Sequence, residues 1–252
     1  MNTKLLKSSI SCLLLTLPLS IGVLPAQAQS SSFPTPLQIS QTFKPPKRPG
    51  YPSSAGAATR GSCSNENKEV KPLIPQNRLG LTFSERPTFF WYQPEKSAKV
   101  AQFLLSVDAD TVNENKVLYE TTIKLPEQAG IVGYTLPENA PTLEVGKTYR
   151  WYLTLICDES DSSGNPRVNG WVERIEPENQ LLENLNKANF RKLPSIYAEA
   201  GIWHEALLAL TQLRTTEPDN IFIRMDWRKF MKSVELQELT DEPIIPCCTT
   251  EN

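Results

Sequence analysis

Apolar and polar residues alternate along one segment, Leu143 to Cys157, and predict a β-strand with one face in the core. Just before the strand, Leu143, Gly146 and Tyr149 have the spacing of a tyrosine corner, in which a tyrosine hydroxyl bonds back to the turn that opens a sandwich strand. This is the best-specified core strand in the chain. The residues expected on its inner face are Tyr149, Trp151, Leu153, Leu155 and Cys157.

Further short apolar segments on both sides of this strand are separated by turn residues. About seven strands in such an order predict an antiparallel β-sandwich with hairpin and Greek-key links, of the immunoglobulin or fibronectin type III kind. The other expected strands are 71–81 as an edge segment, 88–92, 101–107, 117–123, 130–136 and 168–175.

From Pro177 onward the apolar residues recur at helical spacing, so the predicted fold class is α+β. We expect a helical run from about Leu181 to Leu193, a second helix over 202–214 and a third capped by Asp219. The apolar stripe of the third helix is expected to contain Phe222, Ile223, Trp227 and Phe230.

Part of this region resembles one tetratricopeptide repeat, whose large and packing positions are matched by several residues. Pro194 stands where that repeat has a small helical residue, and no second copy follows. We therefore expect a helical hairpin that leans on the sandwich rather than a peptide-binding superhelix. The matching residues are Phe190, Leu193, Tyr197, Ala206, Leu210, Leu213 and Pro218.

The first residues have the three-part layout of a secretory signal peptide, with cleavage expected after Ala28. This predicts a periplasmic or secreted protein with no membrane span once the signal is removed. The proline-rich stretch that follows cannot bury enough apolar surface to order itself. The predicted parts are a signal peptide (1–28), a disordered linker (29–60), a β-sandwich domain (61–176) and an α-helical C-terminal region (177–252).

The formal net charge is −2, and the chain has no long basic run, so nothing indicates a nucleic-acid partner. An even number of cysteines after the signal predicts disulfides. Three pairings are open, and we favour those that join the C-terminal tail to the body, because an adjacent pair departs from relaxed disulfide geometry. We favour disulfides over a zinc site as the role of these cysteines. The four candidates are Cys63, Cys157, Cys247 and Cys248.

Catalytic chemistry has little support in the sequence. His204, the sole histidine, is expected on a helix surface, and any histidine-dependent hydrolytic apparatus would need it. Asp108 and Asp110 fall in a turn, where acidic residues are common. A second acidic cluster only faintly resembles a calcium loop, because Gly170 stands where the bidentate glutamate belongs. The residues of this second acidic cluster are Asp158, Glu159 and Asp161. We expect no enzyme activity, cofactor or metal.

Aromatic residues offer two candidate binding surfaces. Tyr92 and Tyr152 could form a flat platform for sugar rings if both lie on an outer strand face, although strands favour aromatic residues without any ligand. Trp203 and Trp227 lie on predicted helices and are candidate contacts for a protein partner.

Several motifs together resemble one known family: RPGYPSSAGAATRGSC, ERPTFFWY, LEVGKTYRWYLTLICD, VNGWVERI, YAEAGIWHEALLAL and the final CC. As a set they are similar to the exported cyanobacterial family called domain of unknown function 928. The resemblance implies a cell-envelope or secreted location and brings no activity or catalytic residues.

The sequence therefore favours a non-enzymatic interaction module whose partner is another envelope protein. A carbohydrate-binding module for envelope polysaccharide is the alternative, and a hydrolase is the least supported class. An interaction module predicts an exposed apolar patch, whereas a glycan-binding module predicts coplanar exposed aromatic rings.

Overall fold

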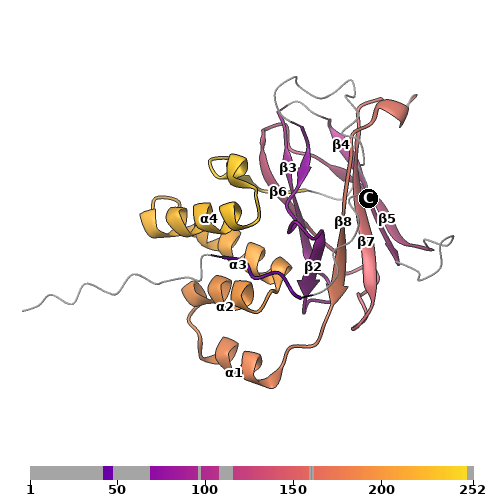
Figure 1. The fold of residues 1–252 in the computed structure, drawn as a ribbon. Coiled ribbons are helices and arrows are strands. Elements are labelled where there is room, and N and C mark those ends of the chain that lie inside the picture. The colour runs from indigo at the N-terminus through magenta and orange to yellow at the C-terminus, as the bar shows by residue number, and fades with distance from the viewer. Residues whose placement is uncertain are drawn as a thin grey trace, which may run out of the picture. The chain divides into compact units, whose positions relative to one another are not determined.

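Over the residues that it describes, the computed structural model contains two β-sheets and four α-helices (Figure 1). The predicted signal peptide and most of the predicted linker lie outside the residues that the structure describes, and so do Cys63, Asp108, Asp110, Glu159 and Asp161. The described residues are 42–47, 69–95, 98–107, 116–158, 160 and 162–248.

The first sheet has four strands, and its central pair is antiparallel. The segment predicted as one edge strand over 71–81 splits, since its first part joins this sheet and its second part joins the other. In spatial order the strands are β1 (Lys71–Pro72), β3 (Thr88–Gln93), β6 (Gly130–Thr135) and β9 (Ile244–Ile245).

The second sheet has five strands, and β2 runs parallel to β8 while the other pairs are antiparallel. A short 3₁₀ turn, Ser162–Gly164, lies between β7 and β8. In spatial order the strands are β2 (Leu79–Thr82), β8 (Arg167–Arg174), β7 (Thr148–Ile156), β4 (Val100–Val107) and β5 (Lys116–Lys124).

Both sheets contribute to one hydrophobic core. The inner face of β7 is the predicted one, since Tyr149, Trp151, Leu153 and Leu155 are all buried. The Tyr149 hydroxyl accepts a hydrogen bond from the backbone N–H of Glu144 at 2.9 Å, as the tyrosine-corner spacing predicts. Gly146, in the turn between them, has a φ of 76°, a conformation that glycine adopts without steric cost.

Strand β3 is buried on both faces, and this explains how the helices attach. Phe89 and Trp91 point into the core between the sheets, whereas Phe90 and Tyr92 belong to a second core shared with the helices. The helices therefore cover the outer face of the four-stranded sheet, as Figure 1 shows.

The helical layer consists of α1 (Asn179–Lys187), α2 (Leu193–Glu199), α3 (Trp203–Thr216) and α4 (Ile221–Ser233). The run predicted over 181–193 breaks at Ala188, whose backbone is extended. A 3₁₀ turn, Phe190–Lys192, follows, with the Asn189 side chain as its cap, and Pro194 then lies in the first turn of α2. Proline is tolerated there because that N–H has no helical partner.

The segment 42–47, from the predicted disordered linker, contacts the helical layer through Phe43, Lys44 and Pro46. Phe43 is 4% exposed, and its ring meets that of Trp203 edge-on at 5.0 Å. The Phe43 N–H donates to the Ser233 hydroxyl, and the Lys44 N–H donates to the Ala198 carbonyl oxygen. The Lys44 oxygen would stand 2.8 Å from any β-carbon at Gly201. For these residues a free linker is the wrong expectation, because one apolar side chain fills a gap between helices.

The C-terminal tail returns to the first sheet after a 3₁₀ turn, Gln237–Leu239. Its strand β9 pairs in parallel with β6, and the Ile131 N–H donates to the Pro243 carbonyl oxygen at 2.7 Å. A β-carbon at Gly130 would stand 2.6 Å from that same oxygen. Main-chain pairing therefore holds the tail against the sheet.

Candidate functional site

The outward side of α4 carries the largest group of exposed apolar residues in the described part of the helices. Ile221 is 57% exposed, Phe222 53% and Met225 46%, and all three fall on the first two turns. Cationic residues lie on the same side of the helix. We call this surface the α4 face; it comprises Ile221, Phe222, Arg224, Met225, Arg228, Lys229 and Lys232.

The rotation of α4 is fixed by its opposite side. Asn220, rather than the predicted Asp219, caps the helix, and its side-chain oxygen accepts from the N–H groups of Phe222 and Ile223. Trp227 is buried, donates its indole N–H to the Thr240 carbonyl oxygen at 3.1 Å and lies under the Arg214 guanidinium. Because these contacts hold the inner side, the apolar residues on the other side face outward.

The α4 face is positively charged. Arg228 forms an exposed ion pair with Asp241 at 2.8 Å, which depresses the pKa of that carboxyl. Arg224, Lys229 and Lys232 add further cations to the same side of the helix. A helix with large apolar residues flanked by cations can bind an anionic amphipathic partner.

The predicted tryptophan contacts are not available for binding. Trp203 and Trp227 are each 1% exposed, and both belong to the core between the helices and the first sheet. The Trp203 indole N–H donates to the Leu73 carbonyl oxygen at 3.1 Å. These side chains are buried because they lie on the inner sides of α3 and α4.

The two tyrosines do not form a common platform. Tyr92 lies on β3, is 2% exposed and is covered by the helices, whereas Tyr152 lies on β7 in the other sheet. The guanidiniums of Arg150 and Arg167 lie over the Tyr152 ring, at 4.9 and 4.0 Å from its centroid. The hypothesis of a paired tyrosine platform is therefore wrong.

His204 is buried at the junction of α3 with the sheets and is not on the helix surface as expected. Its Nδ1 lies 2.9 Å from the Thr88 carbonyl oxygen, so Nδ1 carries the proton and donates. A β-carbon at Gly80 would clash with Nε2 at 2.5 Å, so a glycine is needed for this close approach. Burial lowers the pKa of His204 to about 4, and the ring is neutral at pH 7.

Glu205, the next residue, binds the end of β2. Its Oε1 accepts from the Thr82 hydroxyl at 2.7 Å and from the N–H groups of Phe83 and Ser84 at 2.9 and 3.0 Å. Burial raises the pKa of Glu205, and the three hydrogen bonds oppose that rise. The adjacent His204 and Glu205 thus bind different strands, which makes them attachment points for α3.

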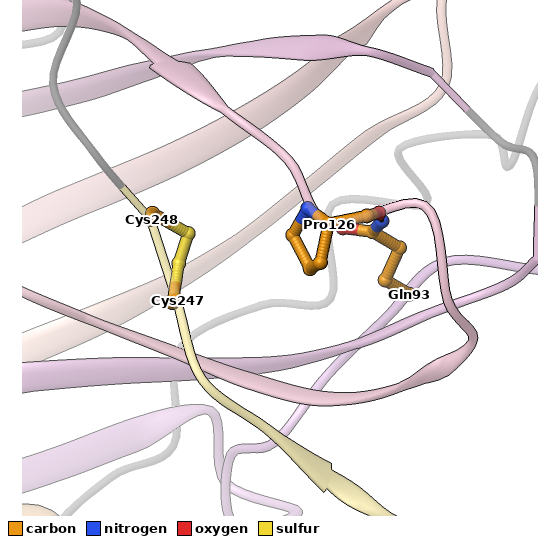
Figure 2. Close-up of a disulfide and its surroundings, with 4 residues drawn as sticks. All are labelled: Gln93, Pro126, Cys247 and Cys248. Atoms are coloured by element: carbon orange, nitrogen blue, oxygen red, sulfur yellow. Dashed lines mark hydrogen bonds between the residues drawn. A yellow bond between two sulfur atoms is a disulfide. The ribbon is translucent and has the colours of Figure 1, made fainter.

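The two C-terminal cysteines are bonded to each other (Figure 2). This pairing differs from the tail-to-body bridges that the sequence favoured, and the strand pairing of β9 explains why no such bridge is needed to position the tail. Cys157 is also a disulfide cysteine, and all three pack against the core between the sheets. Figure 2 also shows Gln93, whose side-chain amide donates to the Pro126 carbonyl oxygen.

A groove of about 950 Å³ lies near Cys157, at the ends of β4 and β7. Its walls carry charges of both signs, and Asp158 is the member that belongs to the predicted acidic cluster. The Asp158 carboxylate accepts from the N–H and the hydroxyl of Ser160, which fits a turn-capping role. The lining residues are 95, 98–100, 127–129 and 156–158.

Two features are absent from the described residues. These residues contain no group of three or more histidine, cysteine, aspartate or glutamate residues placed to hold a metal ion. Among them there is also no helix with the length and apolar character that crossing a bilayer requires.

Sequence reasoning missed the α4 face because it placed Phe222 on the apolar stripe with Ile223. A helical projection would have shown the difference, since Ile223, Trp227 and Phe230 share one side while Phe222 lies about 100° from Ile223. The exposed apolar residues then cluster with the cations rather than with the core.

Together these features define a mixed α and β protein whose helical layer covers one sheet and presents an apolar, cationic helix face. The family model described as Domain of Unknown Function (DUF928) matches residues 55–244, and the chain belongs to that family. No curated protein and no solved structure matches the chain significantly.

Proposed function

We propose that this protein is an exported, non-enzymatic interaction module of the cell envelope and that the α4 face is its docking surface. Its partner is another envelope protein that presents an amphipathic helix with acidic residues beside the apolar ones. The single observation that carries the proposal is the exposure of Ile221, Phe222 and Met225 on one side of a well-anchored helix.

Charge supports this choice of partner. The chain has an overall formal charge of −2, yet the α4 face gathers cations around its apolar residues. Complementary charge accelerates encounter and selects among partners, while apolar burial supplies affinity. An acidic amphipathic helix satisfies both conditions.

The arrangement of the helices supports the same surface. We infer that α2, α3 and α4 resemble the start of a tetratricopeptide-like stack, in which each helix is covered by the next. Among the described residues α4 is the last α-helix, so its outer side is where a further helix from a partner would pack.

We also infer that the two sheets are an immunoglobulin-like sandwich. The supporting features are the shared core, the parallel pairing of β2 with β8, and the tyrosine corner at Tyr149. This architecture provides a rigid support for the helical layer. The sugar-platform alternative loses its basis because Tyr92 is buried.

The test uses two synthetic amphipathic helices that share a leucine face and differ only in their flanking residues, glutamate or lysine. We expect the purified protein to bind the glutamate peptide and to bind the lysine peptide at least tenfold more weakly. The Phe222→Ser variant should bind neither peptide. Val117→Ser, at an exposed valine on β5, is the matched control and should bind normally.

Equal binding of the two peptides would overturn the charge argument, and retention of binding by Phe222→Ser would overturn the site. Vesicles of anionic phospholipid form the third arm. Tight binding to vesicles with no binding to either peptide would show that the face is a membrane-binding surface instead.

A further inference from the structure

A row of arginines and aromatic rings lies on the outer face of the five-stranded sheet. Along β7, the residues that alternate with the buried ones point away from the core, and in register Arg150 is opposite Trp171 and Thr154 is opposite Arg167. On β8, Arg167 is exposed, whereas Trp171 is only 4% exposed and packs with Leu79, Leu81 and Ile202 at the base of the row. Arg78 precedes β2, which pairs with β8. We call this set the arginine row; it comprises Arg78, Arg150, Tyr152, Arg167 and Trp171.

Cations and rings alternate along the row. The Arg167 guanidinium lies 4.0 Å from the centroid of Tyr152, and that of Arg150 lies 4.9 Å from the same ring. Arg150 also lies 4.4 Å from Trp171, and Arg78 lies 5.8 Å from it. Cation–π contacts thus hold three guanidiniums close together.

This concentration of like charge is electrostatically unfavourable without an anion. Burial lowers the pKa of Arg78, and the neighbouring charge of Arg150 lowers it further. Within the described residues neither Arg78 nor Arg167 forms an ion pair with a carboxylate. The acidic residue of the same strand face, Glu173, lies beyond Trp171, at the opposite end from Arg167.

Hydrogen bonds to Asn169 hold two of the three arginines in place. One Nη2 of Arg78 donates to the Asn169 backbone oxygen at 2.8 Å, and Arg150 lies 3.3 Å from the Asn169 side-chain oxygen. Asn169 is itself buried on β8, between the two arginines. Stacking occupies the faces of a guanidinium, while its in-plane N–H groups point sideways and match the geometry of a carboxylate or sulfate.

We propose that the arginine row is a binding site for an acidic polysaccharide, whose carboxylate or sulfate groups repeat along an extended chain. A polymer with repeated anions fits a linear series of cations better than a single anion does. Single-stranded nucleic acid is disfavoured because it binds such surfaces by stacking bases on open aromatic rings, and here guanidiniums lie over the rings. This proposal does not depend on the function proposed for α4.

The test compares dextran sulfate, polygalacturonate and uncharged dextran in affinity electrophoresis of the purified protein. We expect both acidic polymers to retard the protein, dextran to leave its mobility unchanged, and the retardation to weaken as salt rises. Retardation by only one acidic polymer would identify sulfate or carboxylate as the ligand group. No retardation by either would overturn the proposal.

Variants locate the site. Arg167 is exposed, so the Arg167→Gln variant should fold normally and bind the acidic polymers at least threefold more weakly. The Arg167→Lys variant should recover only part of the lost binding, because an ammonium group lacks the planar fork of a guanidinium. Arg224→Gln removes the same charge from the α4 face and is the matched control. Equal weakening by Arg167→Gln and Arg224→Gln would show nonspecific attraction, and equally tight binding of a single-stranded oligonucleotide would contradict the ligand class.

Discussion

The His204 imidazole in α3 donates from Nδ1 to the carbonyl oxygen of Thr88, the first residue of β3, at 2.9 Å. Because burial lowers the pKa of His204 from 6.5 to about 4, the unfolded chain takes up a proton that the folded protein resists. Stability should therefore fall as pH drops from 6.5 to 4, by about 3 kcal/mol in total. Urea unfolding at a series of pH values measures this loss.

The neighbouring carboxyl, that of Glu205, has the opposite effect on the pH dependence of stability. The pKa of Glu205 is raised, so the folded protein takes up this proton before the unfolded chain does, and acidification there favours folding. His204→Gln isolates the histidine, because glutamine does not titrate. The variant should lose stability less steeply with acid than the wild type, and an identical slope in the two proteins would contradict the assignment.

Phe43 should anchor residues 42–47 to the helical layer. Phe43→Ala removes a buried ring that contacts Trp203 and Phe230, and we expect a loss of about 3–5 kcal/mol in the free energy of unfolding. Phe190→Ala is the control, since Phe190 is 47% exposed and should change stability by about 0.5 kcal/mol or less. Equal effects in chemical denaturation would show that the segment is not anchored.

The tyrosine corner should contribute through one hydroxyl. Tyr149→Phe leaves the Glu144 N–H without its partner, and we expect a loss of about 1–2 kcal/mol with little change in packing. Tyr152→Phe, on the opposite face of β7, should be close to neutral. Thermal unfolding of the two variants distinguishes them, and a neutral Tyr149→Phe would contradict the role of the corner.

The pairing of the cysteines can be checked directly. Non-reducing digestion with mass spectrometry should recover Cys247 and Cys248 oxidised within a single peptide. A peptide that joins either of them to Cys157 would contradict the pairing in the structure and restore the tail-to-body bridge.

Short-range patterns predicted much of the fold, because alternation and turn spacing are local. The inner face of β7 and the corner at Tyr149 follow from residues at most a few positions apart. One misassignment had a visible signal in the sequence. The unbroken apolar run of β3 is typical of a strand buried on both faces, which would have placed Tyr92 inside.

Other features depend on long-range packing. Strand β9 has only two residues and forms because it can pair with the edge of β6. Two residues are too few to show the alternation of apolar and polar positions that predicts a strand. The arginine row joins residues 78, 150 and 167, and only the register of three strands brings them together. The residues around His204 predict a helix but do not show which side of it is covered. His204 is buried because Gly80, which has no side chain, lets the sheet approach the imidazole closely.

Photocrosslinking is the sharpest test of the proposed docking of a partner protein on the α4 face. A benzoylphenylalanine placed at Phe222, and separately at Val117 as an equally exposed control, would be irradiated in the native envelope fraction. We expect a discrete protein adduct from position 222 only, and the glutamate-flanked peptide should abolish it. Adducts of the same pattern from both positions, or none from position 222, would contradict the proposed docking.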